Sequence, residues 1–248
     1  MDDKQLLRYS RQIMLPEIDV LGQEKINSSH VAIIGLGGLG CPVAMYLAAS
    51  GVGQLTLVDD DLVELSNLQR QIAHTEDSIG DAKVDAARRT LQGINSQTTV
   101  TTVQVRVDSI ELENLLTDVE VLVDATDNFE VRFAINEMSR KFNLPLVSGA
   151  AIRMEGQVMV LDPRKAESPC YRCLYPTPST EPQNCAENGV FAPLVGVIGA
   201  LQALETLKVI CELSHDSIGW VHYFDAKRME WRKLRLKRNP SCPECGKS

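Results

Sequence analysis

Little in this sequence suits it to a membrane, to export or to nucleic acid. The 248 residues include 25 lysines and arginines against 33 aspartates and glutamates, a formal net charge of −8. A general nucleic-acid binder needs a broad basic surface to neutralise phosphates, so this balance counts against one. No apolar segment follows the acidic start at residues 1–4, and the longest apolar run, residues 189–201, is too short to cross a bilayer and predicts a buried helix. We therefore expect a cytoplasmic protein with neither a membrane nor a nucleic-acid partner.

Motifs and residue types common in other enzymes are also scarce. No G-x-x-x-x-G-K-[ST] sequence is present, which excludes an ordinary P-loop ATPase, and the chain has only four histidines. The one strongly basic stretch, residues 229–239, has few interleaved aromatic residues. It is better explained as a solvated strand than as a nucleic-acid patch, and some of its cations are suited to docking an acidic partner.

Seven cysteines are present, and four of them form two C-x-x-C pairs: Cys170 with Cys173, and Cys242 with Cys245. An odd number of cysteines in a chain without an export signal favours a reducing compartment and metal thiolates over disulfides. Four thiolates are the closed tetrahedral set for structural zinc. The alternative is a thioredoxin-like redox pair, but neither pair is placed to open a helix after a strand as that chemistry needs.

Apolar runs alternate between strand and helix character along the first two thirds of the chain. This alternation predicts an α/β fold with a Rossmann-like, mainly parallel, doubly wound sheet that continues into additional antiparallel strands. The expected strands cover residues 31–34, 54–58, 98–105, 119–125, 144–148, 157–161, 221–224 and 229–236, the last two close enough to form a hairpin. The expected helices cover residues 39–49 and 129–142.

We expect a single domain over residues 1–248. Residues 1–30 would be an N-terminal helical segment and residues 31–161 a nucleotide-binding core. Five of the 11 prolines fall within residues 162–189, which we interpret as a long, exposed, mobile loop. Residues 190–248 would hold a helix, strands and the second cysteine pair.

A glycine-rich segment lies between the first predicted strand and the first predicted helix. Gly35, Gly37 and Gly40 satisfy G-x-G-x-x-G, which permits a tight turn and lets phosphates approach backbone N–H groups at the start of a helix. Asp59 ends the second predicted strand, where an acid normally holds a ribose hydroxyl. Together they predict a nucleotide site. The alternative is a glycine loop that serves only helix–sheet packing.

A redox dinucleotide is the default ligand for this pattern, but the following segments favour another. Arg70, Lys83 and Asp127 all follow strands at the carboxyl edge of the predicted sheet, where ligands bind. Two cations and a free carboxylate suit a triphosphate with Mg²⁺, and hydride transfer needs no such set. Either cation taken alone is explained equally well as a solvated surface charge.

Seven segments together resemble one family. They are RYSRQ at 8–12, GLGGLG at 35–40, SNLQR at 66–70, ATDN at 125–128, SGAA at 148–151, CYRCL at 170–174 and CPECG at 242–246. Over essentially its whole length the sequence is similar to the MoeB/ThiF/HesA family, bacterial relatives of ubiquitin-activating enzymes. These proteins adenylate the C-terminal glycine of small ubiquitin-like sulfur-carrier proteins.

The resemblance implies ATP as the nucleotide and assigns roles around it. Asp59 would hold the ribose, Arg70 and Lys83 would contact the phosphates, and Asp127 would coordinate Mg²⁺. Arg11 would reach the triphosphate from the neighbouring subunit of a homodimer, where an added guanidinium stabilises developing charge. The full nucleotide-binding set that the resemblance implies is Gly38, Asp59, Ser66, Asn67, Leu68, Gln69, Arg70, Lys83, Asp127 and Asn128.

Cys185 lies in a polar part of the proline-rich segment, where the family has a cysteine whose role differs among members. It would accept an acyl group from the adenylate or take part in sulfur delivery. Glu187 beside it would raise the thiol pKa, so activation would have to come from elsewhere. The alternative is an incidental loop cysteine.

The family reaction is ATP-dependent adenylation of a carrier that ends in Gly-Gly, with release of pyrophosphate. The attacking carboxylate is already ionised at neutral pH, so no histidine is needed as a base. Residues 148–157 look closest to the MoeB branch, which acts in molybdopterin synthesis, and the thiamine-pathway carrier is the alternative. Sulfur would come from a separate protein. An NAD-dependent dehydrogenase and a non-catalytic, nucleotide-gated scaffold are alternatives from other classes.

Overall fold

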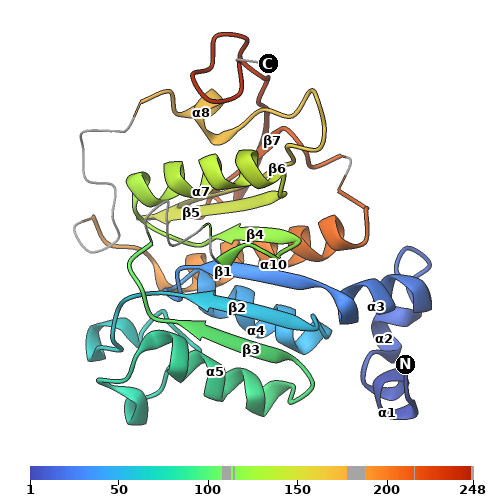
Figure 1. Cartoon of the computed structure of the whole chain (residues 1–248). Helices are drawn as coiled ribbons and strands as arrows, with labels where there is room; N and C mark the ends of the chain where they lie inside the picture. The colour runs from blue at the N-terminus through green and yellow to red at the C-terminus, as the bar shows by residue number, and fades with distance from the viewer. Residues whose placement is uncertain (108–112, 114, 178–187, 215, 247–248) are drawn as a thin grey trace.

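A computed structural model describes residues 1–107, 113, 115–177, 188–214 and 216–246. Within them, eight strands form one sheet in the order β3-β2-β1-β4-β5-β6-β7-β8 (Figure 1). The strands are β1 (His30–Ile34), β2 (Gln54–Val58), β3 (Thr99–Val103), β4 (Val121–Asp124), β5 (Leu146–Ile152), β6 (Glu155–Leu161), β7 (Trp220–Asp225) and β8 (Glu230–Arg235). Pairing is parallel from β3 to β5 and antiparallel from β5 to β8, as the sequence predicts.

Helices cover both faces of the parallel strands. The larger ones are α4 (Gly40–Ser50), α5 (Lys83–Ile94), α7 (Phe129–Phe142) and α10 (Ala192–Ile210). Alternate β1 residues pack into different cores: Val31 and Ile33 join α4, α5 and α10, while Ala32 and Ile34 join α7. Because both faces are covered, every residue of β1 is buried, and the predicted doubly wound arrangement is confirmed.

The apolar helix α10 runs across the sheet. By length and composition alone it could cross a membrane, and it is the only described helix of which this is true. It packs on α4, β5 and β6, and its buried residues include the polar side chains of Gln202, Glu205 and Thr206. Since Gln202 donates to the backbone carbonyl of Asp124 at 2.7 Å, α10 is a core helix tied to the sheet.

Three short helices, α1 (Asp3–Arg8), α2 (Ser10–Ile13) and α3 (Asp19–Ser28), form an N-terminal arm that leads into β1. The arm is anchored by Tyr9, whose hydroxyl accepts a hydrogen bond from Asn95 Nδ2 at 2.9 Å. Asn95 follows the end of α5, and α5 runs back from the carboxyl edge of the sheet. The arm therefore lies at the amino ends of the parallel strands, beside the start of β1 in Figure 1.

Two features differ from the sequence expectations. The strand expected over residues 144–148 continues to Ile152 and turns directly into β6, with Arg153 in the left-handed region at φ 54°. The loop expected over residues 162–189 is not exposed throughout. Residues 168–171 are buried and lead into the short helix α8 (Tyr171–Leu174), because Cys170 joins a cysteine cluster and Tyr171 packs among aromatic rings.

Candidate functional site

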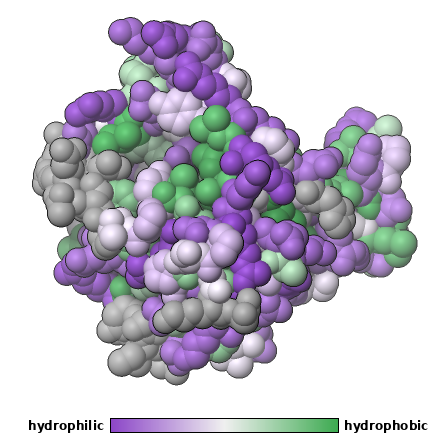
Figure 2. All heavy atoms as spheres, turned by 90° about the horizontal axis from the view of Figure 1, so that it is seen from above, coloured by the Kyte–Doolittle hydropathy of each residue, from purple (hydrophilic) through white to green (hydrophobic). Residues whose placement is uncertain are grey.

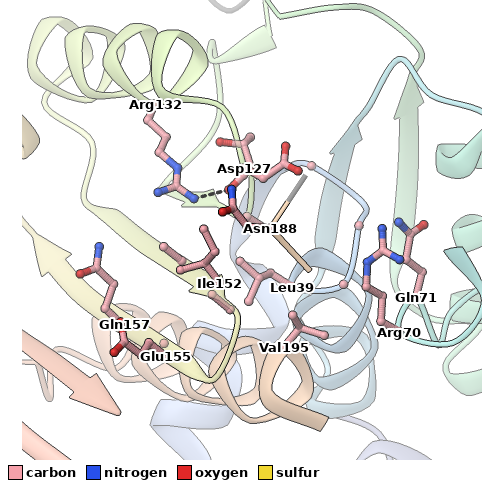
Figure 3. A pocket seen from close by; sticks show the side chains of 18 of the residues that line it. Leu39, Arg70, Gln71, Asp127, Arg132, Ile152, Glu155, Gln157, Asn188 and Val195 are labelled. Carbon is pink, nitrogen blue, oxygen red and sulfur yellow. Dashed lines mark hydrogen bonds between the residues drawn. The ribbon is translucent and has the colours of Figure 1, made fainter. Parts of the chain in front are cut away.

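A cavity of about 580 Å³ lies at the carboxyl ends of the parallel strands, a volume suited to a small-molecule ligand. In the sheet, β1 lies between β2 and β4, so the chain continues to one side of β1 first and to the other side later. The cavity lies at this switch point, where ligands bind in such sheets. Figure 3 shows Arg70 and Gln71 on one side of it and Asp127 and Arg132 on the other. Six members of the nucleotide-binding set that the resemblance implies line it, together with Gly35 and Gly37 of the glycine motif; the six are Gly38, Asp59, Asn67, Arg70, Lys83 and Asp127.

The glycine loop closes tightly between β1 and α4. Gly35 has a φ of +93°, and a Cβ at Gly40 would lie 1.8 Å from the Gly35 carbonyl oxygen. A Cβ at Gly38 would lie 2.8 Å from Cγ2 of Val195 on α10. A side chain therefore fits at none of these positions, and the cavity floor is bare backbone that a phosphate can approach.

Asp59, directly after β2, holds this loop in place through hydrogen bonds. Its Oδ2 accepts a hydrogen bond from the Leu36 N–H at 2.6 Å, and its Oδ1 accepts one from the Asp61 N–H at 2.9 Å. Burial raises the pKa of Asp59, and the nearby Lys83 ammonium opposes that shift. The carboxylate keeps free lone pairs toward the cavity, so it can still accept a ribose hydroxyl.

The two predicted cations approach the cavity from neighbouring elements. Lys83 opens α5, and its Nζ pairs with Oδ2 of Asp61 at 2.6 Å. Arg70 follows the 3₁₀ turn η1 (Leu65–Asn67) and donates to the carbonyl oxygen of Ser66 at 3.0 Å. These contacts hold each side chain at the cavity. Each side chain still has N–H donors left for an anion.

Asp127 lies in the turn between β4 and α7. Its side chain is exposed to the cavity and forms no hydrogen bond or ion pair with another described residue. A free carboxylate beside two cations fits a divalent metal that accompanies a polyphosphate. Asn128, which follows, caps α7 by accepting from the N–H groups of Glu130 and Val131 at 2.8 and 3.3 Å.

Five of the predicted residues are not among those that line the cavity: Arg11, Ser66, Leu68, Gln69 and Asn128. Arg11 lies on the N-terminal arm at the opposite edge of the sheet. Cys185 lies outside the described residues.

The structure adds cavity residues that the sequence analysis missed. Gln71 directly follows Arg70 and is buried, Arg132 projects from α7, and Gln157 and Tyr223 come from β6 and β7. Only Arg132 leaves a signal in the sequence, because a charged residue falls within the apolar stripe of its helix. Gln157 and Tyr223 become visible only when the antiparallel strands are placed beside the glycine loop.

The four predicted zinc cysteines come together away from this cavity. Their sulfur atoms all lie within 4.8 Å of one another, with 3.6 Å between Cys170 and Cys242 and 3.4 Å between Cys173 and Cys245. Zinc–sulfur bonds of about 2.3 Å in a tetrahedron place the sulfurs about 3.8 Å apart, so the cluster fits zinc. The Asn239 N–H donates to Cys173 Sγ at 3.4 Å.

The chain matches the model of the ThiF family over residues 9–244. It is a ThiF-family protein. The resemblance found in the sequence is thus confirmed.

Curated relatives of this ThiF-family chain align over nearly its full length. It is 45% identical over 246 residues to a molybdopterin-synthase adenylyltransferase of Salmonella typhimurium, covering 99% of this chain and 98% of the relative. It is 44% identical over 248 residues to the sulfur carrier protein ThiS adenylyltransferase of Escherichia coli, covering 100% and 98%. It is 41% identical over 249 residues to the SAMP-activating enzyme E1 of Haloferax volcanii, covering 99% and 91%.

Among solved structures, the chain is similar to that of E. coli MccB with ATP. The TM-score is 0.80 at 26% identity, over 92% of this chain and 70% of the other. The Rossmann-like α/β fold and its antiparallel extension are therefore those of a known ATP-bound relative.

Proposed function

We propose that this protein uses ATP to adenylate the C-terminal glycine of a small ubiquitin-like sulfur-carrier protein and releases pyrophosphate. The observation that carries the proposal is one cavity in which a bare glycine loop, Arg70, Lys83 and the unpaired carboxylate of Asp127 converge. Two of the relatives are named adenylyltransferases and a third an activating enzyme, which supports the same reaction. These comparisons favour adenylation over the dehydrogenase and scaffold alternatives.

The chemistry follows from charge. A carboxylate that attacks the α-phosphorus must approach a polyanion, so the site has to neutralise the phosphates and stabilise pyrophosphate as it leaves. Arg70 and Lys83 supply positive charge from one side, and Asp127 would hold Mg²⁺, which offsets phosphate charge when bound. Asp59 and the glycine loop orient the nucleoside.

No protein base is needed, because the terminal carboxylate of the carrier is ionised at neutral pH. The positions of the described histidines agree with a mechanism that has no protein base. His30, His74 and His222 do not line the cavity, and burial lowers the pKa of each imidazole.

The end of the cavity away from the glycine loop is suited to a polypeptide tail. It is lined by residues of the β5–β6 turn and of β7, including Ile152, Glu155 and Tyr223. A tail ending in Gly-Gly has no side chains to obstruct its entry, and its backbone amides can pair with these polar groups.

A homodimer would complete the site. Arg11 lies at the edge of the sheet opposite its own cavity, so it can reach a triphosphate only in another copy of the chain. The N-terminal arm also projects from the body with hydrophobic side chains at its surface (Figure 2), among them Leu7, Met14 and Leu21, which are 79%, 71% and 67% exposed. A second copy would cover such a surface.

Molybdopterin synthesis is the favoured pathway, and the thiamine-pathway carrier is the alternative. The relatives of the two branches are nearly equally similar to this chain, at 45% and 44% identity. The pathway must therefore be decided by the carrier that the protein adenylates. A separate protein would supply the sulfur, and the role of Cys185 in its delivery stays a prediction.

The test is exchange of labelled pyrophosphate into ATP with each candidate carrier. We expect exchange with a carrier ending in Gly-Gly and none with a carrier shortened by its last glycine. Asp127→Ala should abolish exchange in a folded protein, and mixing it with Arg11→Ala should restore part of the activity through dimers that contain one intact site. Absence of exchange with every carrier, together with reduction of NAD on a substrate, would overturn the proposal.

A further inference from the structure

A buried arginine, Arg132 on α7, lies behind the turn that carries Asp127. We propose that Arg132 is a positioning residue that holds the Thr126–Asp127 peptide in place for the metal–nucleotide complex, and that Tyr171 links it to the cysteine cluster. The first part rests on the proposed function, because it concerns the metal-binding role of Asp127. The link between the two sites is a property of the fold itself.

The contacts of Arg132 are directed at backbone of the cavity wall. Its Nη2 donates to the carbonyl oxygen of Thr126 and, at 3.3 Å, to that of Gly149. Figure 3 shows the Arg132 side chain extending toward the segment that carries Asp127. The Thr126 carbonyl belongs to the peptide bond that leads into Asp127, so this hydrogen bond sets the plane of that peptide. The Arg132 residue is 8% exposed, which removes competition from water.

The other side of Thr126 is held by Asp124 at the end of β4. Oδ1 of Asp124 accepts from the Thr126 N–H at 3.1 Å and from its hydroxyl at 2.7 Å, while Oδ2 accepts from the Ser148 hydroxyl at 2.6 Å. Nε of Arg132 lies 3.8 Å from Oδ2 of the same carboxylate. Burying two charges is costly unless their hydrogen bonds are satisfied. Three of the six hydrogen bonds that this pair makes go to Thr126, the residue before Asp127, so the pair specifies the shape of one turn.

Tyr171 joins this pair to the cysteine cluster. It follows Cys170 directly, is fully buried, and its hydroxyl lies 3.4 Å from Nη1 of Arg132. Its backbone N–H donates at 2.7 Å to the side chain of Asn136, one turn further along α7 than Arg132. Its ring packs edge-on against Phe133 at 5.6 Å. The residue after a zinc ligand is thus fixed to the helix that carries the positioning arginine.

The experiment compares Arg132→Gln, Arg132→Lys and Tyr171→Phe with the matched control Arg172→Gln. Arg172 lies in the same aromatic region, over the Phe133 ring at 4.4 Å and paired with Glu244 at 3.5 Å, and it does not line the cavity. Hydrogen exchange is measured on the nucleotide-free protein. ATP binding is then measured by calorimetry with Mg²⁺ and with EDTA.

We expect Arg132→Gln to raise exchange at the amides of residues 126–128 and to raise the Mg²⁺ concentration for half-maximal ATP binding by about tenfold, the effect of one charged hydrogen bond. ATP binding in EDTA should stay unchanged, because the glycine loop is intact. Arg132→Lys should restore part of both effects, Tyr171→Phe should show them to a smaller extent, and Arg172→Gln should show neither.

Unchanged exchange at residues 126–128 in Arg132→Gln would overturn the positioning role, as would equal losses of ATP binding with and without Mg²⁺. Unchanged exchange there in Tyr171→Phe would overturn the link to the cysteine cluster. If no carrier supports pyrophosphate exchange, the proposed function fails, yet the hydrogen-exchange comparison still decides the contribution of Arg132 to the turn.

Discussion

Replacing Lys83 by methionine separates the contribution of its charge to nucleotide binding from its contribution to the fold. The Lys83 side chain is 6% exposed, and its ion-pair partner Asp61 is 64% exposed. Because that partner faces solvent, the pair contributes about 0–1 kcal/mol to stability. Methionine keeps an apolar stem of similar length and brings no charge into the buried position. The free energy of unfolding in urea, measured without nucleotide, should therefore change by less than about 1 kcal/mol.

The effect on ATP binding should be larger. A hydrogen bond from an ammonium to a phosphate contributes about 1.5–3 kcal/mol, which corresponds to a loss of about 10- to 150-fold in affinity. Calorimetry with Mg-ATP measures it directly. Lys25→Met is the matched control, since Lys25 pairs with Glu212 at 2.7 Å on the exposed surface and does not line the cavity. Its ATP affinity should equal that of the unmodified protein.

Asp61→Asn tests the same ion pair from its other partner. Asp61 holds the Lys83 ammonium when no nucleotide is bound, so removing its charge frees that ammonium and should raise ATP affinity. The reasoning is refuted if Lys83→Met binds ATP as tightly as the unmodified protein. It is equally refuted if the variant loses several kcal/mol of stability, because the lysine would then be a structural residue.

Three further predictions concern the loop, the cysteines and the ribose site. Gly40→Ala places a Cβ 1.8 Å from the carbonyl oxygen of Gly35 and should lower the free energy of unfolding in urea by about 3 kcal/mol. In the control Gly93→Ala the added Cβ has nothing within 4 Å, and the free energy of unfolding should rise by about 0.5–1 kcal/mol. Elemental analysis should find one zinc per chain in the unmodified protein; Cys242→Ser should lose it, and Cys211→Ser should retain it. Burial raises the pKa of Asp59 above its ordinary value, so affinity for adenosine should fall as pH drops through that raised pKa; Asp59→Asn should give a flat profile.

The parallel half of the fold could be predicted because its signals are local. Strands β1, β2 and β4 are apolar runs buried on both faces, and the glycine spacing marks the turn from β1 into α4. The cysteine pairs could be matched by spacing alone, since tetrahedral thiolate sites have few arrangements.

The β5–β6 hairpin could not be predicted at its full length, because residues 148–151 of β5 are small and lack strand propensity. Their size is a packing requirement from a distant helix: a Cβ at Gly149 would lie 2.2 Å from Oε1 of Gln202 on α10. The position of Arg132 was missed for a similar reason. Its place in the apolar stripe of α7 is a signal, but a single charge on a helix is usually solvated, and only the fold places Asp124 and Tyr171 against it.

The cysteine cluster joins positions 72 residues apart, with α10, β7 and β8 between them. Closing a loop of that length removes about 4 kcal/mol of conformational entropy from the unfolded chain, by analogy with a disulfide of the same span. Once a metal binds, the cluster therefore stabilises the fold of the last third of the molecule, and that stabilisation depends on the zinc available to the protein. When zinc is limiting, we expect the turns that carry the cysteines to become susceptible to proteolysis first, because α10 within this span stays packed on α4 and the sheet.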